Sequence, residues 1–283
     1  MASPLTARTD DAPLDPDKGD PAGGIPPRIT IAGWLRLTAR VIAMFFAALI
    51  AVPLHYLWRL FRLSSPWPRL FLGATARICG ARVRTVGVPL RRDVFYISNH
   101  ISWIDILALA GASGTAFVAK AEIREAPVVG WLSTLNRTVF VSREDRLGVA
   151  EQINLLRETI AENWSITVFP EGTTTDGHSL KPFKTPMLKV LEPPPAGVYV
   201  QPVMLDYGAV SEEISWIGVE TGKDNAIRLL ARKGSFPMTV NFLDPFDPHD
   251  YPGRKKIAAE SRARIEAALV EALGKPLREF TAH

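Results

Sequence analysis

His100 and Asp105 are the two residues whose types and spacing best suit general-base chemistry. They stand five apart in SNHISWIDI, residues 98–106, which follows an apolar run. On one continuous helix this spacing rotates two side chains by about 140°, onto different faces. The pair can therefore meet only if the chain turns between them, with a helix beginning near Trp103. In that turn Asp105 orients the imidazole, whose other ring nitrogen is free to take a proton from a hydroxyl. The structural alternative is a surface histidine beside a helix-capping aspartate.

A second polar segment, SITVFPEGTTTDGH, covers residues 165–178. Its apolar start predicts a strand that Pro170 ends. Glu171, Gly172, Thr173 and Thr174 then form a loop with many hydroxyl and backbone N–H groups, which suit a polar or phosphorylated head group. The alternative is an ordinary turn.

Three basic residues lie on other elements around these two segments: Lys120, Arg143 and Lys184. Each is by default a solvated surface charge. The body of the chain is basic: residues 1–28 carry a net charge of −2, and the whole chain carries +4. This balance suits phospholipid head groups, phosphorylated substrates or an acidic carrier protein. The sequence lacks an RNA-recognition signature and zinc-finger spacing, so we expect no nucleic-acid partner.

Several chemistries lack their signatures. The sequence has no G-x-S-x-G elbow, and GVETGK at 218–223 is one residue short of a phosphate-binding loop. The single cysteine, Cys79, excludes a disulfide framework, and no helix carries two histidines at metal spacing. Serine hydrolases, nucleotide-driven enzymes and zinc enzymes are therefore disfavoured, and we predict no metal ligands.

The N-terminal third has two predicted parts. Residues 1–28 are rich in proline and aspartate, which predicts a disordered tail. Residues 29–80 form a predicted membrane-associated helical segment, because 41–58 is uncharged and about 27 Å long as a helix. That stretch either spans the bilayer, lies as a kinked hairpin in one leaflet, or is a buried core helix. The amphipathic stretch 67–81 either contacts the membrane or packs on the domain.

Residues 81–283 form the predicted catalytic domain. Strands and helices alternate there, which predicts an α/β fold with a mixed sheet covered by helices on both faces. We predict strands at 82–88, 93–98, 115–119, 138–142, 165–169, 198–204 and 238–242, and helices at 103–111, 127–135, 146–162, 184–191 and 254–273.

Together these segments resemble the glycerolipid acyltransferase family. NHISWID is similar to the family's N-H-x-x-x-x-D block, and FPEGT is similar to its F-P-E-G-T block. The intervening residues 117–144 resemble the family's middle region, and VQPVM at 200–204 resembles its short proline-containing strand. The resemblance covers residues 80–205. Its specificity comes from the occurrence of all four blocks in the family's order.

The resemblance implies an O-acyltransferase that moves an acyl group from acyl-CoA or acyl carrier protein to the hydroxyl of a lysolipid. It assigns His100 as general base, Asp105 as its orienting partner, and Arg143 with the Glu171–Gly172–Thr173 loop to the acceptor. Lys120 and Lys184 are further candidates for substrate binding. The thioester serves as co-substrate, and no other cofactor is implied. We expect the enzyme at the cytoplasmic face of a bacterial inner membrane.

One departure concerns the acceptor. Members that use lysophosphatidic acid continue F-P-E-G-T-R-S, whereas Thr174 and Thr175 stand at the last two positions here. This continuation is more similar to members that acylate lyso-ornithine lipid or other lysophospholipids. Lysophosphatidic acid is our first expectation, because that activity dominates the family, and lyso-ornithine lipid is the alternative. From another class, a non-catalytic lipid-binding protein of the same fold also remains open.

Overall fold

The computed structural model describes residues 29–120, 125, 133–134, 136, 138–141 and 165–279. The predicted tail at 1–28, the predicted helix at 146–162 and Arg143 lie outside these ranges. Most of the predicted helix at 127–135 lies outside them as well.

Within the described ranges the chain forms a seven-stranded sheet in the order β1-β7-β6-β2-β5-β3-β4. Neighbouring strands pair in parallel except β6 and β7, which are antiparallel. The predicted mixed sheet is therefore confirmed, and each predicted strand is found within a few residues of its expected bounds. The strands are β1 (Ala81–Val86), β2 (Val94–Ser98), β3 (Ala116–Lys120), β4 (Val139–Val141), β5 (Ser165–Val168), β6 (Tyr199–Asp206) and β7 (Phe236–Phe242).

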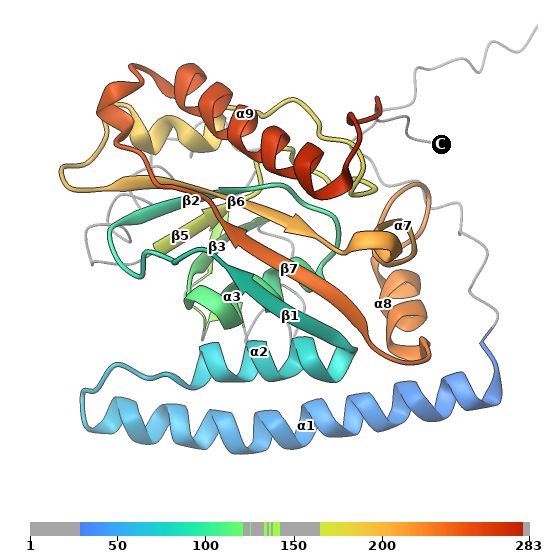
Figure 1. Ribbon diagram of the computed structural model, residues 1–283. Helices are drawn as coiled ribbons and strands as arrows, with labels where there is room; N and C mark the ends of the chain where they lie inside the picture. The colour runs from blue at the N-terminus through green and yellow to red at the C-terminus, as the bar shows by residue number, and fades with distance from the viewer. Residues whose placement is uncertain are drawn as a thin grey trace, which may run out of the picture.

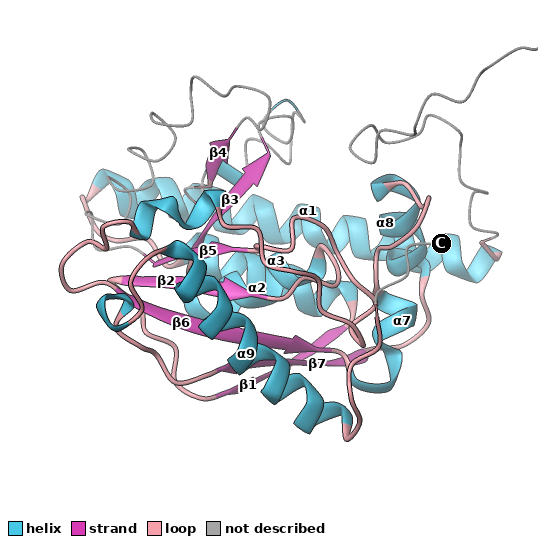
Figure 2. Cartoon of the chain, turned by 90° about the horizontal axis from the view of Figure 1, so that it is seen from above, coloured by secondary structure: helices cyan, strands magenta, loops and turns pink. Residues whose placement is uncertain are grey.

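Helices cover both faces of this sheet, as predicted (Figures 1 and 2). Helices α2 (Trp67–Cys79) and α3 (Ile104–Ser113) pack on one face, and α9 (Arg254–Leu273) with the 3₁₀ helix η1 (Pro186–Leu191) packs on the other. Because both faces are covered, every residue of the central strands β2 and β5 is buried. Sequence analysis missed α7 (Ser211–Ile214), α8 (Gly222–Ala231) and the short 3₁₀ helices η2 (Gly208–Val210) and η3 (Pro248–Asp250).

Helix α1 (Ile31–Leu60) is longer than the predicted apolar stretch and continues through Pro53. It lies along α2 and α8 on the outside of the domain (Figure 1). It is long and apolar enough to cross a membrane, yet only 6% of its most apolar window is buried. A buried core helix is therefore excluded. The exposed large apolar side chains of α1 are Ile31, Trp34, Leu35, Val41, Ile42, Phe45, Phe46, Leu49, Ile50, Tyr56, Leu57 and Leu60.

Two arginines of α1 bind the end of α8. Arg36 donates from Nε to the Ala231 carbonyl at 2.9 Å. Arg40 donates to the carbonyls of Leu229, Leu230 and Gly234 at 2.9–3.1 Å. The last carbonyls of a helix have no partner within it and carry partial negative charge, so cations stabilise them. The first half of α1 is therefore bonded to the domain.

Helices α2 and α3 cross at two glycines. A Cβ built on Gly111 would lie 2.6 Å from the Gly73 Cα, so a side chain there would force the helices apart. Beside this crossing, Arg69 of α2 donates to the carbonyls of Gly111 and Ala112 at 3.1 and 3.2 Å. Arg69 thus caps the end of α3, and the amphipathic stretch 67–81 packs on the domain here. This crossing fixes α3, which carries Asp105, against α2.

We predict that Arg40→Met lowers the Tm of the detergent-solubilised protein by about 4–8 °C. The substitution removes hydrogen bonds from a charged donor to three carbonyls, a loss on the order of 2 kcal/mol. Arg59→Met is the matched control, because Arg59 is an exposed arginine near the other end of the same helix. Equal melting temperatures for the two variants would contradict this role of Arg40.

Candidate active site

The site lies where three neighbouring parallel strands end. Strands β6, β2 and β5 are adjacent in the sheet and run in the same direction. The residues that follow their carboxyl ends therefore gather at one edge, where α/β sheets commonly bind ligands. These residues are Tyr207 after β6, Asn99 and His100 after β2, and Phe169 and Glu171 after β5.

The predicted turn brings His100 and Asp105 together. Helix α3 begins at Ile104, so His100 lies in the turn before the helix and Asp105 in its first turn. The imidazole Nδ1 lies 2.8 Å from Asp105 Oδ2. Because an ionised carboxylate only accepts hydrogen bonds, Nδ1 carries the proton and Nε2 keeps its lone pair. The Asp105 side chain is fully buried, whereas 16% of the His100 side chain is exposed. This is the geometry of an oriented general base.

The Asp105 carboxylate also organises the turn itself. Its Oδ2 accepts hydrogen bonds from the backbone N–H groups of Ile101 and Ser102 at 2.6 and 2.9 Å. Asp105 therefore has both of the roles considered from the sequence. It accepts hydrogen bonds from the backbone of the turn before α3, and it orients the His100 ring. Its second oxygen, Oδ1, accepts a hydrogen bond from the Tyr207 hydroxyl at 2.6 Å.

The loop after β5 holds His100 from the other side. The imidazole stacks on the Phe169 ring with centroids 4.1 Å apart and planes 16° apart. The His100 carbonyl accepts hydrogen bonds from the backbone N–H and the hydroxyl of Thr175, at 2.8 and 3.2 Å. The histidine ring and backbone are thus both fixed before any substrate arrives.

Glu171 is buried beneath this loop, with 1% of its surface exposed. Its two oxygens accept hydrogen bonds from the backbone N–H groups of His100 and Lys181, each at 2.9 Å. Burial raises the pKa of Glu171 to about 8, and the charge of Asp105 adds to this, while the two N–H donors act in the opposite direction. In this structure Glu171 joins two loops, and its role toward the acceptor stays a prediction.

The other predicted acceptor residues of this loop differ in exposure. Thr173 is exposed. Thr174 is 8% exposed, and its hydroxyl donates to the Trp216 carbonyl. Gly172 adopts φ +76°, and a Cβ there would lie 3.1 Å from Lys184 Nζ. The exposed Lys184 therefore places a cation against the backbone of this loop.

The two remaining predicted residues are less well placed. Lys120 is the last residue of β3, which neighbours β5. Arg143 lies outside the described residues, so its assignment to the acceptor stays a prediction. In the part of the chain that the structure describes, no group of three His, Cys, Asp or Glu side chains could hold a metal ion.

Three residues that the sequence pattern did not single out support the turn that carries His100. The Asn99 side chain exchanges hydrogen bonds with the backbone of Leu205 at 2.8 and 2.9 Å, which ties the turn to β6. Trp103 donates from Nε1 to the Asn225 side chain of α8 at 3.0 Å. Tyr207 comes three residues after the predicted strand at 198–204, so its position at the strand end was the available signal.

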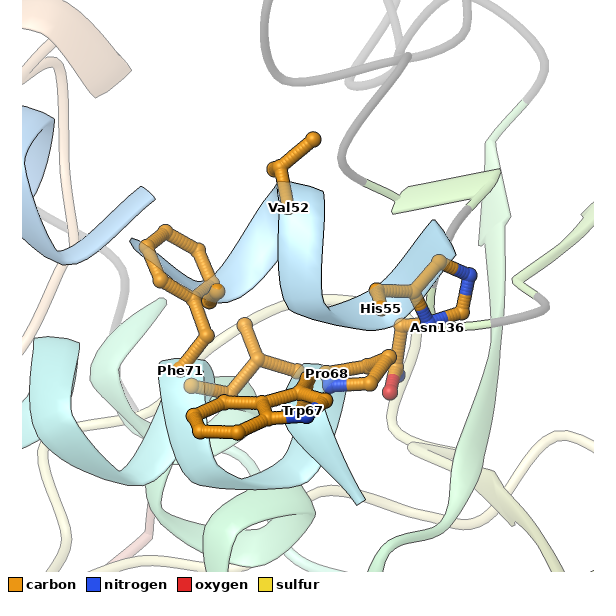
Figure 3. Close-up of a pocket in the computed structure, with 8 residues that line it drawn as sticks. Val52, His55, Trp67, Pro68, Phe71 and Asn136 are labelled. Atoms are coloured by element: carbon orange, nitrogen blue, oxygen red, sulfur yellow. The ribbon is translucent and has the colours of Figure 1, made fainter. Parts of the chain in front are cut away.

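A small cavity lies away from this site, between α1 and α2 (Figure 3). It measures about 20 Å³, room for about one water molecule. Its size excludes a lipid head group in this conformation. It is lined by Ala51, Val52, His55, Trp67, Pro68, Phe71, Leu72 and Asn136.

A histidine oriented by a buried aspartate thus lies at the carboxyl edge of an α/β sheet, an arrangement suited to general-base chemistry. The acyltransferase family model matches residues 82–206. The chain is 32% identical to a lyso-ornithine lipid O-acyltransferase from Brucella abortus (strain 2308), over 85% of this chain and 96% of that protein. The chain therefore belongs to the lysolipid acyltransferase family, and the resemblance seen in HISWID and FPEGT is confirmed.

A second relative and a solved structure are also similar to this chain. A 1-acyl-sn-glycerol-3-phosphate acyltransferase from Neisseria meningitidis serogroup B is 33% identical over 96 residues, which are 34% of this chain and 38% of that protein. The crystal structure of the 1-acyl-sn-glycerophosphate (LPA) acyltransferase PlsC from Thermotoga maritima shares the fold, with a TM-score of 0.60 and 21% identity over 84% of this chain and 97% of that chain. Family and exposed apolar helix together indicate a membrane-associated enzyme with lipid substrates.

The raised pKa of Glu171 predicts a pH-dependent stability. In the unfolded chain Glu171 loses its proton near its ordinary pKa of 4.5, whereas the folded protein holds it to about pH 8. Folding stability from this group is therefore full below pH 4.5 and decreases as pH rises toward 8, by about 1.4 kcal/mol per unit at most. We expect the Tm of Glu171→Gln to decrease less than that of the wild type between pH 5 and 8. Parallel Tm curves for the two proteins would contradict this.

Proposed function

We propose that this enzyme acylates the free hydroxyl of a lysolipid with an acyl thioester, using His100 as general base and Asp105 as its orienting partner. The observation that carries the proposal is the His100 ring itself. Its Nδ1 is bound to a buried carboxylate, and the ring remains partly exposed at the strand ends. Family membership supplies the reaction class.

The proposed reaction needs no covalent enzyme intermediate. Nε2 of His100 removes the proton of the lysolipid hydroxyl as its oxygen attacks the thioester carbonyl. Asp105 stabilises the imidazolium that forms. The tetrahedral intermediate then expels the thiolate, which takes the proton back from His100 and leaves as a thiol. Because a thioester is already activated, positioning and deprotonation supply most of what the protein must provide.

We propose lyso-ornithine lipid as the acceptor. The Brucella abortus relative, which aligns with 85% of the chain, bears that activity in its name. The loop supports the same acceptor, because Thr174 stands where lysophosphatidic acid enzymes carry an arginine. A threonine carries no positive charge, and the Thr174 hydroxyl already donates to the Trp216 carbonyl, so this residue offers a phosphate neither a cation nor a free O–H donor.

Lysophosphatidic acid is the second candidate acceptor. The Neisseria relative carries that activity in its name, although it aligns with a third of the chain. Lys184, beside Gly172, provides a cation at the same loop that suits a phosphate. The two acceptors are therefore tested side by side.

The donor and the location complete the proposal. Either acyl-CoA or acyl carrier protein supplies the acyl group as a co-substrate, and both are anionic partners for a basic domain. Acyl thioesters are made and used in the cytoplasm, which places the site at the cytoplasmic face of a bacterial inner membrane. Because α1 lies against the domain along its length, we propose that it lies in one leaflet rather than spanning the bilayer.

We predict that His100→Ala lowers kcat by at least about 100-fold, the usual share of a positioned general base. The measurement is mass spectrometry of products from purified protein offered acyl-CoA or acyl carrier protein with each lysolipid. His249→Ala is the matched control, since His249 forms an exposed pair with Asp247 at 2.7 Å outside the site.

Loss of activity in His100→Ala, with activity kept in His249→Ala, would support His100 as the general base. An inactive wild type with every lysolipid would favour the non-catalytic lipid-binding alternative. A wild type that converts lysophosphatidic acid and leaves lyso-ornithine lipid unchanged would replace our acceptor with the second candidate.

We predict that membrane attachment resists 1 M salt. Attachment rests on the apolar side chains of α1, whose burial contributes about 25 cal/mol per Å² and is not screened by ions. A variant with Phe45, Phe46 and Leu49 changed to Gln should be released far more readily in a membrane sedimentation assay. Quantitative release of the wild type by salt would show that attachment is electrostatic.

A further inference from the structure

Tyr207 is the first residue after β6, and its side chain is completely buried. Its hydroxyl donates to Asp105 Oδ1 at 2.6 Å. The two residues lie 102 positions apart in the sequence. They meet because β6 is the neighbour of β2, whose carboxyl end leads into the catalytic turn.

The two oxygens of the Asp105 carboxylate accept different numbers of hydrogen bonds. Oδ2 accepts hydrogen bonds from three groups, the His100 ring and the N–H groups of Ile101 and Ser102. Among the described residues, Oδ1 accepts one, from Tyr207. Without that hydroxyl, Oδ1 would be a buried oxygen with no hydrogen bond, which is costly for a carboxylate. The position of Oδ2 under the imidazole therefore depends on Tyr207.

Tyr207 is held in the form that donates. Burial and the adjacent Asp105 raise the pKa of Tyr207 well above its ordinary value of 10. Two other titratable groups face this pair. Burial raises the pKa of Cys79, at the end of α2, to about 12, so its thiol is neutral. Glu171 faces Asp105 from the loop after β5.

We propose that Tyr207 is a positioning residue for the acyl transfer and forms a chain of hydrogen bonds Tyr207–Asp105–His100. This role rests on the proposed function, since it assumes that His100 removes the acceptor proton. The phenol fixes the carboxylate so that Oδ2 stays on the Nδ1–H group. It also draws negative charge toward Oδ1 and away from the imidazole, which sets the pH at which the ring takes up a proton.

Removing the Tyr207 hydroxyl should change both kcat and the pH dependence of the rate. The carboxylate is less firmly held, so the ring spends less time in its productive orientation and kcat decreases. More charge resides on Oδ2, so a protonated ring is held more strongly. The acid limb of the rate profile then moves to higher pH. A residue that only fills space in the core would not move that limb.

The test is Tyr207→Phe, which keeps the buried ring and its contact with Phe236. Tyr96→Phe is the matched control. Tyr96 is also fully buried, on the adjacent strand β2, and its hydroxyl donates to the Leu90 carbonyl. NMR titration of the His100 imidazole in the detergent-solubilised full chain gives a readout independent of activity. We expect the titration midpoint to move upward by about half a pH unit or more in Tyr207→Phe and to stay unchanged in Tyr96→Phe.

Kinetics provide the second readout. We expect Tyr207→Phe to lower kcat about 10-fold at the pH optimum, with KM changed less than about twofold. In an Asp105→Asn background the same substitution should change kcat less than about twofold, because the hydroxyl acts through the carboxylate.

An unchanged or lowered titration midpoint in Tyr207→Phe overturns the proposal, as does a full additional loss of kcat in the Asp105→Asn background. These results differ from a failure of the proposed function. If His100→Ala kept its activity, the reaction mechanism would be wrong, while an upward midpoint in Tyr207→Phe would still establish the hydrogen-bonded chain.

Discussion

The hydrogen bonds to the buried Asp105 carboxylate are the interactions on which the rest of the site depends. A carboxylate is stable without solvent only when its oxygens are hydrogen-bonded. Here the donors come from the catalytic turn, the imidazole and the end of a neighbouring strand. The strand order is thus a chemical requirement as well as a packing solution. Only with β6 beside β2 can the residue after one strand reach the carboxylate that follows the other.

The same logic explains the loop after β5. Glu171 accepts a hydrogen bond from the His100 N–H group, and Thr175 donates to the His100 carbonyl. The Phe169 ring stacks on the imidazole. The FPEGT block, residues 169–173, therefore positions His100 in this chain. Two segments therefore hold the histidine: α3 provides the pairing with Asp105, and the loop after β5 provides the backbone hydrogen bonds and the stacking.

Much of this arrangement could be predicted from the sequence, for physical reasons. Buried strands are apolar runs, and a five-residue His–Asp spacing leaves a turn as its only solution. Tyr207 could not be identified, because a tyrosine after an apolar strand resembles ordinary core until the strand order is known. Helix α8 was missed because it is only ten residues long and low in average hydrophobicity, although its apolar residues gather on one face. The hydrogen bonds of Arg36, Arg40 and Arg69 to helix carbonyls could not be predicted, since sequence spacing does not reveal which carbonyls lie within their reach.

Helix α1 packs on α2, and α2 packs on α3. This stacking sets the distance between the apolar surface of α1 and the start of α3. Packed helices lie about 8–10 Å apart, so the start of α3 stands roughly two helix layers above the apolar surface of α1. The glycine crossing at Gly73 and Gly111 makes one of these layers thinner, and Arg36 and Arg40 hold α1 against the end of α8. On the proposed function, with α1 lying in one leaflet, an acceptor would have to rise by that distance before its hydroxyl met His100. The packed helices would then act as a spacer perpendicular to the membrane.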